Sequence, residues 1–326
     1  MAERPTPPAG LVLMVSTATL LVFVVIVLSA YIRLGDAGLG CAEWPTCFGQ
    51  IGAHDNRSLA EGGPLLPPSA ARSFHRVAAT VFGFIVIGIV VLAARRRREA
   101  PGIVLPLLVF ALTVFLSVLG VVTPSPLVPL VTLGNVLGGM TLLALLWVIG
   151  QRLQPKPSLE PAAAQSLRPW ARGALVAVVL QIALGAWTSG SFAGPACPSL
   201  AGCEGASLSV DSLAQSYAPT RRVATDDRGK VVSDANQKTV HAVHRLGAAL
   251  AFAAIMLLGL RARRAPALRS AANVLLALLA IQIGIGILAV AFALPLSLAA
   301  LHNANAALLL LAVVNLNLHL TTKPNA

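Results

Sequence analysis

The sequence predicts an all-α polytopic membrane protein in which eight transmembrane helices form two repeated four-helix bundles. Of the 326 residues, 56% are hydrophobic and 11% are charged, whereas a soluble domain carries about 25% charged residues. The mean hydropathy of +0.80 points the same way. The apolar residues gather in runs long enough to cross a bilayer as helices. The third observation is a repeat, because two cysteine pairs and two His-Arg pairs recur at matching places.

Eight apolar runs are separated by short polar or proline-rich connections. We expect membrane spans at about 9–32, 73–94, 102–122, 127–149, 171–189, 239–260, 268–292 and 297–318. Arg95–Arg98 end the second run, and the sixth run ends in a similar basic cluster at Arg261–Arg264. Thr123-Pro124-Ser125-Pro126 predicts a tight turn between the third and fourth runs.

The net charge of +12 does not predict nucleic-acid binding, because the basic residues stand in short connections between apolar runs. Such basic loops set membrane orientation, since they stay on the cytoplasmic side. The two long cysteine loops mix both signs of charge. We therefore expect a multi-pass protein of a bacterial-type inner (plasma) membrane. Both termini would be cytoplasmic, both cysteine loops extracytoplasmic, and the lipid bilayer the surrounding partner.

The repeat follows from residue spacing. Cys41 and Cys47 are six residues apart, as are Cys197 and Cys203, and each cysteine of the first pair lies 156 residues before its counterpart. We expect an N-terminal four-helix half over residues 1–152, a cytoplasmic linker over 153–170, and a C-terminal four-helix half over 171–326. Cofactor sites in four-helix bundles are built from side chains on facing helices.

Histidines in the apolar runs are the candidate ligands of such a site, because polar side chains inside a membrane are expensive and usually functional. His75-Arg76 and His244-Arg245 open equivalent spans, and His302 lies 58 residues after His244. His244 and His302 at matching depth suit the two axial positions of a b-type heme iron. The alternative is that each histidine only bridges helices by a hydrogen bond.

The first half is less complete. Counting about 60 residues from His75 reaches Asn135 instead of a second histidine. One strong axial ligand suits a site that accepts or releases a heme, and the alternative is a degenerate half-site that binds none. Arg76 and Arg245 follow their histidines and are candidate contacts for heme propionates. His241, three residues before His244, would touch a heme edge or lie at the wet interface, and the interface is favoured.

The four cysteines are predicted to form disulfides, because their loops face an oxidising compartment. Pairing within each loop, Cys41 with Cys47 and Cys197 with Cys203, is the simplest of three connectivities. Redox-active thiols are one alternative. Zinc binding is another, and it is less favoured because companion ligands do not cluster nearby.

Two outer segments and the histidine spans resemble the heme A synthase family of cytochrome oxidase assembly proteins, which has bacterial and mitochondrial members. The first segment runs from Tyr31 to Gly49 and contains Gly38-Leu39-Gly40-Cys41 and Trp44-Pro45-Thr46-Cys47. The second contains Leu184-Gly185-Ala186-Trp187-Thr188-Ser189-Gly190, followed by Cys197-Pro198 and Cys203. Together with the His-Arg pairs and His302-Asn303, the resemblance covers nearly the whole chain.

The resemblance implies an eight-helix membrane oxidoreductase that oxidises the C8 methyl group of heme O to a formyl group, giving heme A for cytochrome oxidase biogenesis. It implies a heme b held by His244 and His302, and heme O as substrate near His75. Two positions depart from the family. Arg72 stands where a catalytic glutamate is expected, so the catalytic residue is unknown, and Asn135 stands where a second substrate-site histidine is expected.

Those two departures keep other function classes open. One is a non-catalytic heme-binding oxidase-assembly factor, and another is a b-type cytochrome that passes electrons through the membrane. If the chain is a heme A synthase, its expected partners are heme O, a heme O synthase and an electron donor. A homo-oligomer is also possible on the sequence alone.

Overall fold

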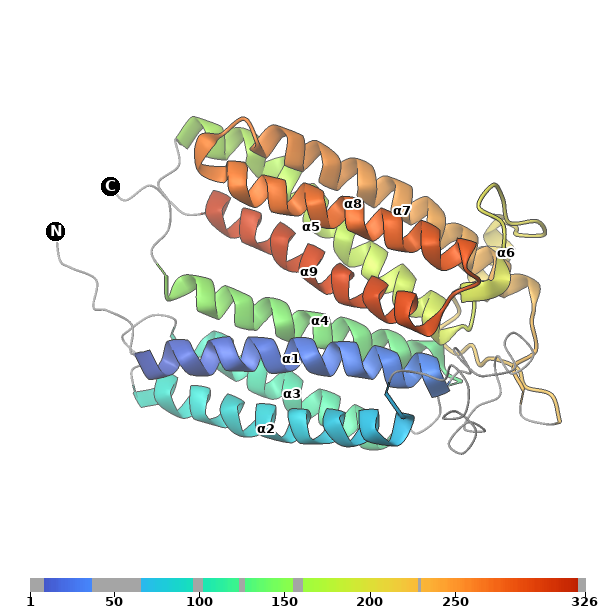
Figure 1. Ribbon diagram of the computed structural model, residues 1–326, viewed down its shortest axis with the longest axis horizontal. Coiled ribbons are helices and arrows are strands. Elements are labelled where there is room, and N and C mark those ends of the chain that lie inside the picture. The colour runs from blue at the N-terminus through green and yellow to red at the C-terminus, as the bar shows by residue number, and fades with distance from the viewer. Residues whose placement is uncertain are drawn as a thin grey trace.

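Eight long helices lie side by side in the computed structural model (Figure 1). The structure describes residues 9–36, 66–95, 102–122, 127–154, 161–227 and 230–321. The first four long helices are α1 (Ala9–Asp36), α2 (Pro68–Arg95), α3 (Val104–Val122) and α4 (Pro129–Arg152). The second four are α5 (Pro161–Gly190), α7 (Ala235–Ala262), α8 (Arg269–Ala291) and α9 (Leu296–Thr321). All eight are long and apolar enough to cross a membrane, which confirms the predicted all-α membrane fold.

The remaining elements described by the structure are short. Helix α6 (Val210–Ser216) and the 3-10 turn Gly194–Ala196 lie between α5 and α7, and a second 3-10 turn, Pro266–Leu268, joins α7 to α8. An isolated antiparallel bridge pairs Thr225 with Val231. The segment between α5 and α7, predicted as a loop, is thus partly ordered by local hydrogen bonds.

Each half packs its helices in the same cyclic order. In the first half α1 contacts α2 and α4, and α3 contacts the same two helices. In the second half α5 contacts α7 and α9, and α8 contacts the same two helices. Consequently α2 faces α4 across one bundle, and α7 faces α9 across the other. Between the halves, α4 packs on α5 and α9, and α1 packs on α9.

The interface between the halves is tightly packed. Leu143, Leu146 and Ile149 of α4 are completely buried, as is Leu316 of α9. Apolar helices gain little by hydrophobic transfer out of lipid, so close van der Waals packing supplies much of their association energy. Within the second half, the amide of Asn317 on α9 donates to the carbonyl of Ala171 on α5 at 2.9 Å.

Helix α5 begins at Pro161, inside the stretch 153–170 that was predicted as a linker. Proline is well suited to the first helical turn, where its missing N–H has no partner to lose. Ala164, Leu167 and Ala171 follow at helical spacing and are buried in the core. That burial outweighs the presence of Pro169 inside the helix. Arg168 also donates from Nε to the carbonyl of Leu320, at 2.7 Å, at the end of α9.

Helix α7 begins at Ala235 rather than near Thr239, because a capping box fixes its start. The Asp234 carboxylate accepts from the backbone N–H of Gln237 at 2.9 Å, and the Gln237 side chain accepts from the Asp234 N–H at 3.3 Å. Arg221 pairs with the same carboxylate at 3.1 Å. The capping box thus satisfies two backbone N–H groups at the start of α7. Together with the ion pair, it lets the helix begin one turn before the apolar run.

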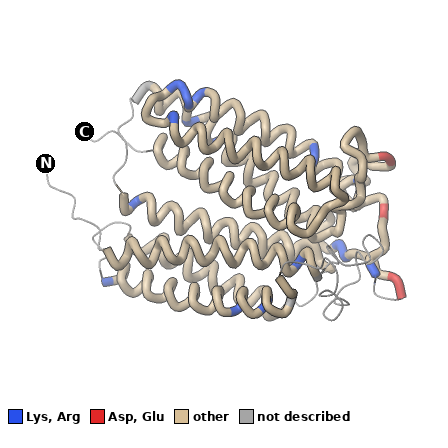
Figure 2. Tube along the Cα trace, viewed as in Figure 1, with Lys and Arg blue, Asp and Glu red and all other residues tan. Residues whose placement is uncertain are grey.

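The two ends of the bundle carry different charges. Figure 2 shows the described acidic residues gathered at the end that carries α6, whereas basic residues lie at both ends and stand without acidic ones at the opposite end. Helix α1 begins and α9 ends at that opposite end (Figure 1). His75, His244 and His302 lie in the half of their helices that is nearer to the α6 end (Figure 1).

Candidate cofactor site

His244 lies on α7 and is held by the neighbouring helix α5. The side-chain amide of Gln181 donates to the His244 carbonyl at 3.1 Å and lies 3.0 Å from Nδ1 of the same residue. A carbonyl only accepts, so this contact fixes the amide nitrogen of Gln181 toward His244. Four residues further along α5, Gly185 leaves space for the imidazole, since a Cβ there would lie 3.2 Å from its Cε1.

His302 lies on α9 and is held in the same manner by α8. The Gln282 amide nitrogen donates to the His302 carbonyl at 3.2 Å and lies 3.1 Å from Nε2 of the ring. Asn305 donates to the Gln282 oxygen at 2.7 Å and to the Leu278 carbonyl at 2.9 Å. Gly286, again four residues after the glutamine, would place a Cβ 3.4 Å from Cε1 of His302.

The four corners of the second bundle therefore alternate in role. Helices α7 and α9 stand at opposite corners and carry the histidines, while α5 and α8 stand at the other corners and carry the glutamines. Facing side chains on opposite helices are the arrangement from which bundles build cofactor sites.

Two buried polar atoms of this site make no hydrogen bond among the described residues. They are Nδ1 of His302 and Oε1 of Gln181. A buried ring nitrogen without a hydrogen-bond partner is costly unless a bound group contacts it. Imidazole nitrogens are good ligands of heme iron. The residues present thus fit a metal ligated from opposite helices, as a b-type heme requires.

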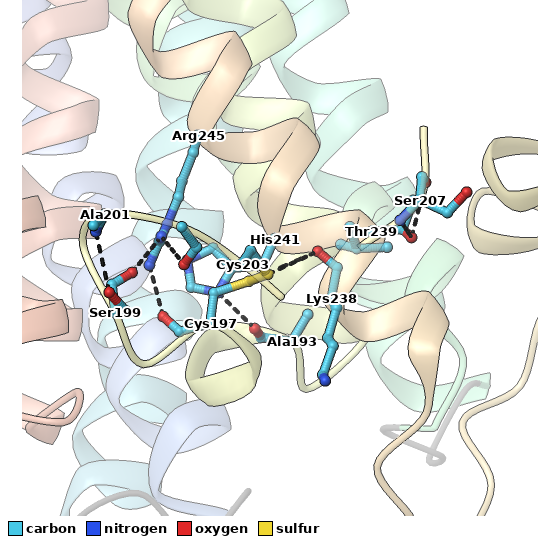
Figure 3. Close-up of a disulfide and its surroundings, with 12 residues drawn as sticks. Ala193, Cys197, Ser199, Ala201, Cys203, Ser207, Lys238, Thr239, His241 and Arg245 are labelled. Atoms are coloured by element: carbon cyan, nitrogen blue, oxygen red, sulfur yellow. Dashed lines mark hydrogen bonds between the residues drawn. A yellow bond between two sulfur atoms is a disulfide. The ribbon is translucent and has the colours of Figure 1, made fainter. Parts of the chain in front are cut away.

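The structure gives Arg245 a different contact from the heme propionate predicted for it. Its guanidinium donates to the carbonyls of Cys197 at 2.6 Å, Ser199 at 2.7 Å and Gly202 at 3.4 Å. These carbonyls belong to the loop that the disulfide closes (Figure 3). Arg245 therefore fastens this loop to α7, one residue after His244.

A disulfide joins Cys197 to Cys203, with the two Cα atoms 4.8 Å apart. Both sulfur atoms lie against the carbonyl of Lys238 near the start of α7, at 3.8 and 3.5 Å (Figure 3). The disulfide predicted between Cys41 and Cys47 lies outside the described residues. In the second half, the short loop is thus covalently closed and held against the histidine helix.

His241 is buried, with 6% of its surface exposed, and does not lie at the wet interface that the sequence favoured. Its Nδ1 is 3.0 Å from the carbonyl of Ala193 (Figure 3). Because that carbonyl only accepts, Nδ1 carries the proton and donates it. The expectation that His241 lies at the wet interface is wrong, because the segment after α5 folds back over this face of α7.

An aromatic pair covers the same end of the bundle. Trp187 and Tyr217 stack with ring centroids 5.7 Å apart, and the Trp187 indole donates to the Ser216 carbonyl at 3.0 Å. The Tyr217 hydroxyl is 3.5 Å from the Val240 carbonyl on α7. Burial raises the pKa of Tyr217 to about 12, so its phenol stays neutral well into the alkaline range.

The first half places its candidate residues on opposite corners too. His75 is half-buried on α2, and Asn135 is half-buried on α4, which faces α2 across the bundle. Arg76 is exposed, and its carbonyl accepts from Thr80 at 2.8 Å. Arg72 is half-buried one turn before His75. His75 and Asn135 thus lie on helices that face each other across the first bundle, as the helices of His244 and His302 do in the second.

Comparison with known proteins decides the family. The family model COX15-CtaA, described as cytochrome oxidase assembly protein, matches residues 12–63 and 71–314. A heme A synthase from Shewanella oneidensis is 32% identical over 268 residues, covering 79% of this chain and 81% of that protein. The chain belongs to this family. The family-model match includes His75 on α2 and His244 on α7, and the predicted resemblance to the heme A synthase family is confirmed.

Within this heme A synthase family member, sequence reasoning missed the two glutamines. Their signal is a short repeated pattern, Gln181-Ile182-Ala183-Leu184-Gly185 on α5 and Gln282-Ile283-Gly284-Ile285-Gly286 on α8. A glutamine inside an apolar run is costly without a partner. Searching the apolar runs for amides as well as for histidines would have found both residues.

Proposed function

We propose that this protein is a heme A synthase, which oxidises the C8 methyl group of heme O to a formyl group for cytochrome oxidase biogenesis. The observation that carries the proposal is the pair of histidines on opposite helices of one bundle, in a chain of this family. Conversion of a methyl to a formyl group adds one oxygen atom and removes four electrons and four protons when water supplies the oxygen. The substrate site must therefore lie close to a route for electrons.

We propose heme b as the resident cofactor of the second half, with His244 and His302 as axial ligands. When bound there it would supply a one-electron carrier inside the membrane. The chain supports this by holding both imidazoles from neighbouring helices and by burying a ring nitrogen of His302 that has no hydrogen-bond partner among the described residues. Gly185 and Gly286 keep the imidazoles unobstructed.

We propose the first half as the site of heme O, with His75 as an iron ligand and Asn135 beside the opposite face. An asparagine is a weaker ligand for iron than an imidazole, so the substrate would be held less firmly than the resident heme. That difference suits a molecule that must enter, react and leave. Arg76 near the α6 end of α2 would contact a propionate of heme O.

The orientation proposed for the protein has both termini in the cytoplasm of a bacterial-type cell. The basic ends of α2, α4 and α7 lie at the end of the bundle where α1 begins and α9 ends (Figure 2). Positive residues in short connections stay on the cytoplasmic side. The disulfide loop would then face the oxidising compartment. Heme O synthase and an electron donor are the proposed partners.

Coexpression with a source of heme O tests the activity. Extracted cellular hemes should contain heme A when this protein is present and only heme O when it is absent. A second candidate function is a heme-binding assembly factor without catalysis, which Arg72 and Asn135 favour because both replace residues of the family site. Unchanged heme O in the presence of folded, heme-loaded protein would select this second function and reject the synthase.

A further inference from the structure

Both histidines of the second bundle are contacted by a glutamine from the next helix, and the two contacts have the same form. In each, the amide nitrogen donates to the carbonyl of the histidine and also lies within about 3 Å of a ring nitrogen: 3.0 Å for Gln181 with His244, and 3.1 Å for Gln282 with His302. Each glutamine is therefore attached to the backbone and to the ring of one residue. This double attachment sets the direction in which the ring points.

The first bundle lacks these amides at the matching places. A shift of 156 residues, the offset between the cysteine pairs, carries Gln181 onto Val25 of α1. A shift of 167 residues, which carries His302 onto Asn135, carries Gln282 onto Phe115 of α3. Neither side chain can hydrogen-bond an imidazole. The glutamine contacts thus accompany the candidate ligand pair His244 and His302 of the second bundle, and the matching positions of the first bundle have no amide.

We propose that Gln181 and Gln282 are positioning residues that fix the ring orientation and the proton-bearing nitrogen of the two axial histidines. This inference rests on the proposed heme b site. A neutral imidazole has one N–H and one lone pair, and iron takes the lone pair. The ring nitrogen that faces the glutamine would then carry the proton and need an acceptor. Each amide presents its nitrogen to the ring in this structure, so on heme binding it would turn to present its oxygen and give up its bond to the histidine carbonyl.

The two glutamines differ in how firmly they are held. Oε1 of Gln181 is buried without a hydrogen-bond partner among the described residues, so turning its amide by half a rotation brings an unused acceptor to the His244 ring. Oε1 of Gln282 already accepts from Asn305 at 2.7 Å, and turning this amide toward the ring would break that bond. We therefore expect the Gln181 amide to turn at the loss of its bond to the His244 carbonyl alone, whereas the Gln282 amide would also lose its bond from Asn305 and should turn less readily.

The test compares Gln181→Glu and Gln282→Glu with the parent protein, each purified with its heme. A carboxylate only accepts, so it makes the ring a stronger electron donor, which favours ferric iron. We expect a lower midpoint potential and shifted low-spin ferric electron paramagnetic resonance signals, at unchanged heme content by pyridine hemochrome. Gln165→Glu, the same change at an exposed position of α5, should leave both readouts at their parent values.

Each outcome decides the proposal. Parent potential and parent resonance signals in both Glu variants would overturn it, and so would loss of heme from a folded Glu variant, since the carboxylate should still hold the ring. Gln181→Leu and Gln282→Leu, which remove the contact, should broaden the resonance signals of the heme that remains bound. A parent protein that binds no heme would instead refute the proposed heme site, so the two failures are distinguishable.

Discussion

Arg33 on α1 donates from Nε to the hydroxyl of Ser189 on α5, at 3.1 Å, and so joins the two halves of the molecule. The two residues are 156 positions apart, which is the offset between the cysteine pairs. Equivalent positions of two repeated units touch each other when they lie beside an axis that relates the units. The contact marks the place, at the α6 end of the helices, where α1 and α5 approach each other.

Removal of this contact should weaken the association of the halves. Arg33→Ala is expected to lower the free energy of unfolding by about 1.5–3 kcal/mol, because the lost hydrogen bond involves a charged donor. Thermal unfolding of the protein in detergent measures the change. In a double-mutant cycle with Ser189→Ala, the two effects should be less than additive. Strictly additive losses would show that the two side chains contribute independently.

Loss of an axial ligand should remove the resident heme. His302→Ala takes away the imidazole opposite α7, and we expect the purified protein to lose most of its heme b absorbance. His319→Ala, a change of the same kind at the other end of α9, should keep the parent heme content. Pyridine hemochrome spectra of both variants give the comparison. A full heme spectrum in His302→Ala would refute this ligand assignment.

Sequence periodicity and composition were sufficient to predict the eight helices, because each apolar run is bounded by charges, prolines or glycines. The histidines were found for a similar reason, since polar residues stand out inside such runs. Helix ends were harder to predict. The stretch 153–170 was predicted as a linker, yet burial of Ala164 and Leu167 carries α5 back to Pro161.

Tertiary contacts account for the other differences between expectation and structure. Arg245 was assigned to a propionate, and its donors are instead used by carbonyls 43 to 48 residues earlier in the chain. Nothing in the local sequence reveals that the loop folds onto α7. His241 was placed at the interface for the same reason. Both residues depend on how the segment after α5 returns across the end of the bundle.

A methyl group at Gly185 should disturb the imidazole of His244. The added Cβ of Gly185→Ala would lie 3.2 Å from Cε1, so the ring or the helix must shift by a few tenths of an ångström. We expect weaker heme retention during dialysis against a heme-binding protein such as apomyoglobin. Gly173→Ala, on the same helix with nothing within 4 Å of its added Cβ, should retain heme as the parent does. Equal retention in both variants would show that the ring tolerates the shift.

Tyr217 should make stability depend on pH in the alkaline range. Its folded-state pKa of about 12 lies above the ordinary value of 10.0, so the folded protein favours the neutral phenol. The stability this contributes is complete below about pH 10 and is lost as pH rises toward 12. Tyr217→Phe should remove that part of the alkaline loss of melting temperature. In Tyr31→Phe, which leaves Tyr217 as the remaining tyrosine of the chain, tyrosinate absorbance should rise only near pH 12.

Arg245 offers a way to separate a loop contact from a heme contact. Arg245→Ala removes the donors to the Cys197, Ser199 and Gly202 carbonyls, so we expect the loop to open more often and the disulfide to be reduced faster by a soluble phosphine. Arg245→Lys keeps the charge and some of the donors, and its reduction rate should fall between those of Arg245→Ala and the parent. Labelling of the freed thiols with maleimide follows the reaction.

The heme midpoint potential of the same variants shows whether Arg245 contacts the disulfide loop or a heme propionate when heme is bound. If Arg245 serves the loop, the midpoint potential of the heme should stay near the parent value while reduction of the disulfide accelerates several-fold. A propionate contact predicts the reverse, because removal of a cation beside the heme lowers the potential without exposing the sulfurs. If the disulfide is reduced at the parent rate while the heme midpoint potential falls, Arg245 contacts a propionate in the loaded protein. The hydrogen bonds to three carbonyls of one short loop favour the first outcome.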